Sequence, residues 1–185
     1  MIIGLAGTIG AGKGTVVDYL KSKGFVQYSS SGLLGELVEK EGNPRIRDFL
    51  SPMATRLQKE FPGGVVEKAY NEKYLLQEPE NAIFEAIHRK SEADFLKSVG
   101  GKIIGIDADL ETRFKRTTLR NEGEKDHGDF EDFKKQAAIE DEGGGGASRD
   151  NNIRLVINEA DAVIYNDGTV AELQGQIEDI LKKIS

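Results

Sequence analysis

The sequence predicts a three-layer α/β/α fold in which helices cover both faces of a five-stranded parallel sheet. Three observations support this prediction. Short apolar runs alternate with amphipathic helical patterns along all 185 residues, an order typical of parallel sheets with crossover helices. A glycine-rich loop joins the first apolar run to the first helix, and no internal repeat interrupts the alternation. The length favours a single domain with one sizeable core.

The expected strands are apolar runs short enough to be buried strands, and each is followed by a helical pattern. They cover residues 2–6, 25–28, 81–87, 102–107 and 162–165. The first helix ends at Gly24, and the last runs from Thr169 to Ile184. The strand-and-helix core then comprises residues 1–28, 79–120 and 151–185, with a helical insertion at 29–78 and a polar lid at 121–150.

Composition and charge exclude several classes of protein. The net charge of −7, with 38% hydrophobic and 31% charged residues, indicates a globular protein that neither binds nucleic acid polymers in general nor binds membranes. With no cysteine and two histidines, neither a disulfide framework nor a thiolate or histidine-rich metal site is possible. The chain opens on a strand and a loop and has no apolar run of membrane-spanning length, so we expect a cytoplasmic protein.

The residues from Gly7 to Thr15 predict a phosphate-binding loop, because they stand between a strand and a helix. The loop's glycines let the backbone curl so that successive N–H groups point into one hollow, behind which a helix N-terminus favours an anion. Lys13 adds positive charge for the outer phosphates, and the hydroxyl that ends the motif, here Thr15 after Gly14, usually coordinates Mg²⁺. The alternative is a glycine-rich turn that binds nothing. The expected donor-binding residues of the loop are Gly7, Thr8, Ile9, Gly10, Ala11, Gly12, Lys13, Gly14 and Thr15.

Glu85 lies toward the end of the third expected strand, which is otherwise apolar. A carboxylate in that place is costly unless a cation pairs with it. Beside a phosphate-binding loop, that cation is Mg²⁺ with its water shell. We therefore expect Glu85 to hold the metal through water, together with Thr15; the alternative is an ion pair with Arg89 or Lys90.

The helical insertion and the lid supply further candidates, each with a plain structural alternative. Serines at 29–31 follow the second strand, where they either cap the next helix or contact a ligand. Arg45 has the planar fork that suits phosphate recognition, but it is equally a solvated helix charge. Arg113, Arg116 and Arg120 recur at helical spacing, which predicts a phosphate clamp; the alternative is that the helix macrodipole favours cations toward the C-terminal end. The polar segment after them is either a mobile flap or a disordered loop, with one short helix at Phe130, Phe133 and Ala137.

Three stretches carry a family resemblance that covers essentially the whole chain. The loop resembles the adenylate-kinase form, which also places a glycine between lysine and threonine. Residues 84–89, Phe-Glu-Ala-Ile-His-Arg, are similar to the strand end at which that group places an acidic residue and, four residues later, an arginine. Residues 160–168 resemble the ending of dephospho-CoA kinases. The chain is therefore similar to the P-loop kinases of the nucleoside monophosphate kinase and dephospho-CoA kinase group, most closely an uncharacterised adenylate-kinase-related branch of archaea.

The resemblance implies a P-loop kinase fold, with the insertion binding the acceptor and the lid closing over ATP and Mg²⁺. It implies phosphoryl transfer from ATP to a small acceptor, with a nucleoside or deoxynucleoside monophosphate preferred. Dephospho-CoA is the alternative acceptor, and a nucleotide-binding regulatory ATPase is the alternative of another class. The aspartates that both kinase types carry after strand two are absent from residues 28–33, which leaves the acceptor open. The resemblance implies catalytic roles for Lys13, Arg89, Arg116 and Arg120, joined by Arg149 or Arg154 from the far side of the lid. It implies that the acceptor is bound by Ser30, Ser31, Arg45 and Arg89. It implies that Asn166 and Gly168 contact the adenine.

Overall fold

Among the residues that the structure describes, five strands form one parallel sheet, as predicted. Their order is β2-β3-β1-β4-β5. The computed structural model describes residues 1–120, 129–142 and 152–184, with the backbone alone of Arg120 and Glu142. Within these ranges the strands are β1 (Ile2–Gly7), β2 (Val26–Ser29), β3 (Ala82–Glu85), β4 (Lys102–Asp107) and β5 (Ala162–Tyr165). The central position of β1 explains its apolar sequence, because helices bury both of its faces.

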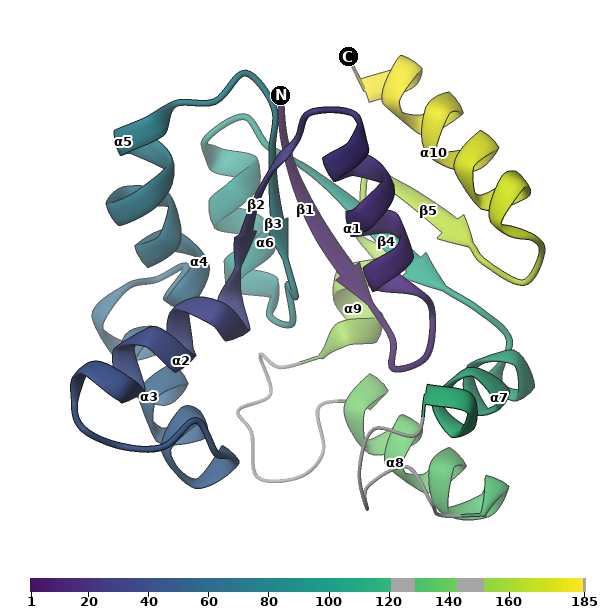
Figure 1. Cartoon of the computed structure of the whole chain (residues 1–185), viewed down its shortest axis with the longest axis horizontal. Coiled ribbons are helices and arrows are strands. Elements are labelled where there is room, and N and C mark those ends of the chain that lie inside the picture. The colour runs from purple at the N-terminus through teal and green to yellow at the C-terminus, as the bar shows by residue number, and fades with distance from the viewer. Residues whose placement is uncertain (121–128, 143–151, 185) are drawn as a thin grey trace.

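Helices cover both faces of the sheet, with the insertion beyond the β2 edge (Figure 1). They are α1 (Lys13–Ser22), α2 (Ser30–Lys40), α3 (Arg47–Glu60), α4 (Gly64–Ala69), α5 (Leu75–Gln77), α6 (Lys90–Ser98), α7 (Leu110–Arg120), α8 (Phe130–Glu142), α9 (Ile153–Asn158) and α10 (Val170–Ile184), with a π-helical turn, η1 (Tyr70–Tyr74), before α5. The short helix expected inside the polar segment is α8, in which Phe133 and Ala137 are buried. The rest of the expected lid, residues 121–128 and 143–150, lies outside the described residues.

The core consists of two clusters, one on each face of the sheet. Ile3, Leu5 and Ile104 of the strands pack with residues of α1 and α10 on one face. Phe84 and Ile103 point to the other face, where residues of α2, α3, α4, α6 and α9 cover them. Alternate residues of each strand thus enter opposite clusters, as the period of two requires.

The third strand is shorter than predicted, since it ends at Glu85 instead of residue 87. Ala86 adopts a φ of 64°, in the left-handed region that breaks the extended backbone. The chain then bends back toward β1, where the Ile87 amide donates to the Leu5 carbonyl oxygen at 3.0 Å. The bend leaves Glu85 as the last residue of the strand.

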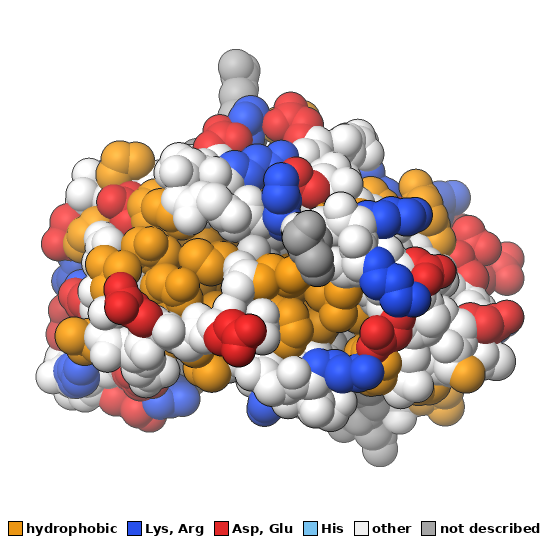
Figure 2. Space-filling model, turned by 90° about the horizontal axis from the view of Figure 1, so that it is seen from above, with side chains coloured by type: hydrophobic (Ala, Val, Ile, Leu, Met, Phe, Trp, Pro, Cys, Tyr) orange, Lys and Arg blue, Asp and Glu red, His pale blue; other side chains and the backbone are white. Residues whose placement is uncertain are grey.

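The end of the sheet opposite the loop carries both termini (Figure 1). Seen from above, this end shows hydrophobic side chains gathered toward the side of α5, with charged side chains around them (Figure 2). Leu75 and Leu76 of α5 are among the exposed hydrophobic residues. Within the described ranges, no helix combines the length and apolar character needed to cross a membrane.

Candidate functional site

The glycine-rich loop lies between β1 and α1, at the carboxyl edge of the sheet. Gly10 and Gly12 have φ angles of 78° and 93°, which favour glycine because a Cβ would be strained there. Packing adds a second constraint. A Cβ on Gly10 would lie 2.6 Å from the Arg113 carbonyl oxygen, and one on Gly12 would lie 2.3 Å from Asn166 Nδ2. Both glycines therefore let α7 and the segment after β5 close against the loop.

Two side chains hold the loop's carbonyl groups from outside. Arg113 Nε donates to the Ile9 carbonyl oxygen at 2.8 Å, and Asn166 Nδ2 donates to that of Ala11 at 2.8 Å. In a trans peptide the C=O and the following N–H point in opposite directions. The amides of Gly10 and Gly12 consequently point away from these two side chains. Converging backbone amides form a concavity that suits an anion such as phosphate.

Lys13 is the first residue of α1 and is half-buried. Its Nζ donates to the Gly7 carbonyl oxygen at 2.9 Å, so the ammonium group lies across the loop. Gly14 and Thr15 are exposed in the first turn of α1, at the end of the helix that favours negative charge. Amides, an ammonium group and an accessible Thr15 hydroxyl are the donor set that a nucleoside triphosphate with Mg²⁺ requires.

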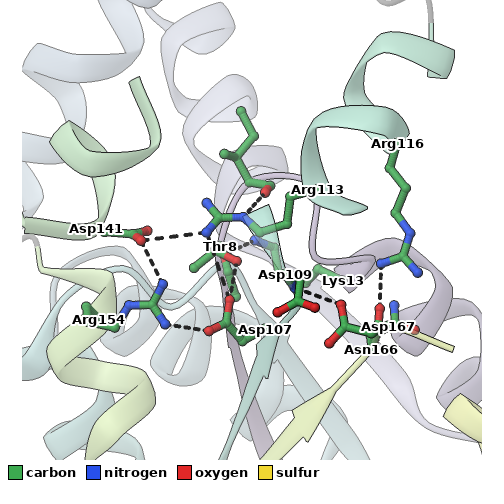
Figure 3. Close-up of polar contacts among 12 residues, drawn as sticks. Thr8, Lys13, Asp107, Asp109, Arg113, Arg116, Asp141, Arg154, Asn166 and Asp167 are labelled. Carbon is green, nitrogen blue, oxygen red and sulfur yellow. Dashed lines mark hydrogen bonds and ion pairs between the residues drawn. The ribbon is translucent and has the colours of Figure 1, made fainter. Parts of the chain in front are cut away.

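The segment after β5 approaches the loop from a second side (Figure 3). Arg116 Nη1 donates to the Asn166 carbonyl oxygen at 2.7 Å, and the Asp109 amide donates to Asp167 Oδ1 at 2.7 Å. Asn166 is 5% exposed and joins this segment to the loop through Ala11. The structure thus brings Arg116 and Asn166 together beside the loop. Gly168 lies in the following turn, where a Cβ would be 2.3 Å from Glu172 Oε2. The side chain of Arg120, the other arginine expected at this site, lies outside the described atoms.

Glu85 ends β3, the strand next to the one that carries the loop. In the parallel register it stands beside Leu5 of β1 and Ser29 of β2, and its side chain is half-buried. No cluster of three or more acidic, histidine or cysteine side chains that could hold a metal occurs among the described residues. Mg²⁺ usually takes only one or two protein carboxylates together with substrate phosphates, so a single strand-end glutamate fits it.

His88 and Arg89 follow β3 and lead into α6. The amides of both residues donate to Glu92 Oε2, at 3.0 and 3.2 Å, which fixes the start of the helix. His88 is an exposed residue, yet desolvation of its imidazole by the surrounding protein and the positive charges of Lys13 and Arg89 lower its pKa from 6.5 to about 4. His88 lies three residues after the end of β3, which pairs with β1, the strand that leads into the glycine-rich loop.

Sequence reasoning missed a charge network beneath the loop, formed by Asp107, Arg113, Asp141 and Arg154 (Figure 3). Arg154 donates to both carboxylates: Nη1 to Asp107 Oδ2, and Nη2 to Asp141 Oδ2 at 2.7 Å. Asp107 Oδ1 also accepts from Thr8 Oγ1 at 3.0 Å. Asp107 ends β4 as Glu85 ends β3, so the strand-end argument applied to Glu85 could have identified it.

The network buries Arg113 and pairs Arg154 with Asp107 and Asp141. Arg113 is 2% exposed, with its guanidinium against the loop and Asp141. Among the described side chains of Arg113, Arg116 and Arg120, only that of Arg116 lies at the edge of the site, where it donates to the Asn166 carbonyl oxygen. The expected clamp of three arginines on one helix face is therefore not formed by Arg113.

Of the acceptor residues expected from the sequence, Ser30 and Ser31 open α2, and Arg45 lies against Gly35 of the same helix. Ser29, the last residue of β2, caps α2, since its Oγ accepts from the Gly32 amide at 3.2 Å. Ser30 is buried and Ser31 is exposed. Arg45 is exposed and paired with Glu39, with Nε 2.8 Å from Oε1 and Nη2 2.9 Å from Oε2.

A cleft of about 230 Å³ lies at the β2 edge, between α2 and the end of α4 with η1. The cleft is lined by Gln27, Tyr28, Ser29, Gly32, Leu33, Glu36, Ala69 and Lys73. Lys73 Nζ donates to Glu36 Oε1 at 2.8 Å, so the two charges that line the cleft neutralise each other. Polar and apolar side chains line the cleft alike, and its lysine is the one paired with Glu36.

Three comparisons place this arrangement among known proteins. The family model AAA_18, an AAA domain, matches residues 3–138. A UPF0200 protein of Sulfurisphaera tokodaii is 30% identical over 187 residues, covering 99% of this chain and 97% of that protein. The fold matches shikimate kinase from Bacteroides thetaiotaomicron, with a TM-score of 0.58 and 16% identity over 98% of both chains.

Dephospho-CoA kinase from Campylobacter jejuni gives a TM-score of 0.57 at 15% identity, over 100% of this chain and 97% of the kinase. At these identities the likeness to solved structures concerns the fold. The five-stranded sheet, its loop and its flanking helices are those of the P-loop kinases, as the sequence predicted. The chain belongs to the UPF0200 family and to the AAA domain family AAA_18, on a P-loop kinase fold.

Proposed function

We propose that the protein transfers the γ-phosphoryl group of ATP to a nucleoside or deoxynucleoside monophosphate. The observation that carries this proposal is the loop itself, whose Gly10 and Gly12 amides point away from Arg113 and Asn166 and across which the Lys13 ammonium group lies. Phosphoryl transfer needs positioning and charge neutralisation more than a nucleophilic side chain. Loop amides and a lysine on a rigid sheet supply both.

In the reaction, the bond between the γ-phosphorus and the β–γ bridging oxygen breaks, and a phosphate oxygen of the acceptor bonds to that phosphorus while ADP leaves. The loop amides and Lys13 hold the β- and γ-phosphates. Thr15, with Glu85 through water, would hold Mg²⁺, which would supply positive charge to these phosphates. Arg89 aligns the acceptor, and Arg116, with Arg120, balances the charge that develops in transfer. Asn166 and Gly168 stand beside the adenine.

One observation favours a second acceptor, dephospho-CoA. Arg45 and Arg56 of the insertion are paired with Glu39 and Glu41, so neither is preorganised for a second phosphate. An acceptor that reacts through a ribose hydroxyl group needs a carboxylate base at its reacting oxygen, where a phosphate acceptor needs an arginine. Of the two serines expected to bind the acceptor, Ser31 is exposed and offers a hydroxyl group to either acceptor, whereas Ser30 is buried.

A coupled assay of ADP release separates these possibilities. ATP and Mg²⁺ are supplied with each nucleoside monophosphate, each deoxynucleoside monophosphate, or dephospho-CoA. We expect release only with a matching acceptor, and loss of release in Lys13→Ala with its melting temperature unchanged. ADP release that needs no acceptor would instead identify a regulatory ATPase, and full activity in Lys13→Ala would refute the assigned site.

A further inference from the structure

Arg113 is a buried cation whose position is not explained by packing alone. It is 2% exposed, and its guanidinium lies 5.9 Å from the centre of the Phe133 ring. Its Nη2 is buried and has no hydrogen-bond partner in the structure. Burying a guanidinium with an unsatisfied N–H is costly, and an apolar side chain would fill the same space at lower cost. A hydrophobic residue could supply neither the hydrogen bond to the loop nor the ion pairs with Asp107 and Asp141.

That hydrogen bond fixes one peptide group. Arg113 Nε donates to the Ile9 carbonyl oxygen at 2.8 Å, and the trans geometry turns the Gly10 amide to the opposite side. The backbone of the same residue supports the loop, because a Cβ on Gly10 would lie 2.6 Å from the Arg113 carbonyl oxygen. Arg113 therefore sets both the orientation of the Ile9–Gly10 peptide and its distance from α7.

Two carboxylates hold Arg113 in place. Arg113 Nη1 lies 3.6 Å from Asp141 Oδ2 and 4.0 Å from Asp107 Oδ1. Arg154 joins the same two carboxylates, so two acidic and two basic side chains balance each other next to the loop. Asp107 also accepts from Thr8 Oγ1, which ties a second loop residue to the network. The loop is thereby connected to β4, α7, α8 and α9 through paired charges.

We propose that Arg113 is a positioning residue for the phosphates of the donor nucleotide. It holds the Ile9–Gly10 peptide so that the Gly10 amide faces the phosphate, and Asp107 and Asp141 hold its guanidinium. This inference rests on the proposed function, since it requires a nucleotide on the loop. The competing explanation is a purely structural one, in which Arg113 only joins α7 to the loop.

Binding of ADP and of adenosine, measured by calorimetry, distinguishes the two explanations because adenosine carries no phosphate. We expect Arg113→Met to weaken ADP binding by about 10- to 100-fold, as for loss of a hydrogen bond to a charged group, and to leave adenosine binding unchanged. Arg113→Lys keeps a donor and should recover part of the loss. Asp141→Asn should weaken ADP binding in the same direction by a smaller factor. Lys115→Met and Asp132→Asn, exposed on α7 and α8, are matched controls that should bind ADP normally.

The ratio of ADP to adenosine affinity decides the outcome. A melting temperature that falls in Arg113→Met while this ratio stays constant would overturn the positioning role. If Arg113→Met does not fold, Arg113→Lys and Asp141→Asn give the same ratio, and an unchanged ratio in both would again overturn the role. A wild-type protein that binds neither ADP nor inorganic pyrophosphate would refute the proposed function first, and this inference with it.

Discussion

Ala86 holds a left-handed backbone conformation at the end of β3, with a φ of 64°. Replacing it with glycine removes the clash of the Cβ atom, which costs about 1–2 kcal/mol in this region. Glycine also lowers the stability by about 0.5–1 kcal/mol, because it gives the unfolded chain more conformational freedom to lose on folding. We therefore expect Ala86→Gly to raise the free energy of unfolding by about 0.5–1 kcal/mol, or roughly 1–4 °C in melting temperature for a chain of this size.

Urea denaturation at pH 7 and a thermal melt measure this change. Ala54→Gly, inside α3, is the matched control and should lose about 1 kcal/mol, since it has ordinary helical backbone. A lower unfolding free energy for Ala86→Gly than for the wild type would refute the reasoning. The refutation would mean that the Ala86 methyl group contributes more through packing than its backbone costs in strain.

Two further predictions follow from the site. Gly12→Ala should lower the melting temperature and abolish ADP binding, because its Cβ would lie 2.3 Å from Asn166 Nδ2 and the residue has a φ of 93°. Gly14 has open space around its Cβ position, so Gly14→Ala should melt no lower than the wild type. Equal melting temperatures for these two variants would contradict the packing described for Asn166. The free energy of unfolding should fall as the pH drops from 6.5 toward 4. In this range His88 binds a proton in the unfolded chain but stays neutral in the folded protein, where its pKa is about 4. Urea titrations at pH 7 and 5 should show a smaller loss for His88→Gln, and an equal loss would contradict the lowered pKa of His88.

Features with local causes were predictable from the sequence. Apolar runs predict the strands, and a glycine pattern between a strand and a helix predicts the phosphate-binding loop. The sequence allowed two roles for the serines after the second strand, either capping the next helix or contacting a ligand. In the structure, Ser29 caps α2. Glu85 was identified as the strand-end acid because a buried strand tolerates few charges, although the bend at Ala86 was not visible in the sequence.

The charge network was not predictable, because its partners lie far apart in the chain. Asp107 and Arg154 are separated by 47 residues, and only the fold brings them together. Helical spacing also misled the interpretation of α7. Residues three apart on an α-helix differ by about 60° in direction, which is enough to bury Arg113 and leave Arg116 at the edge of the site. The pairing of Arg45 with Glu39 likewise depends on the turn between α2 and α3.

The proposed phosphate site depends most directly on two backbone amides, those of Gly10 and Gly12, as hydrogen-bond donors to phosphate. Amide proton shifts of the ¹⁵N-labelled protein, recorded during titration with ADP and Mg²⁺, measure both donors at once. We expect downfield shifts for Gly10 and Gly12, no comparable shift with adenosine, and unchanged signals for Gly24 and Gly42, which share the positive φ but lie elsewhere. Unshifted Gly10 and Gly12 signals at saturating ADP would contradict the proposed site.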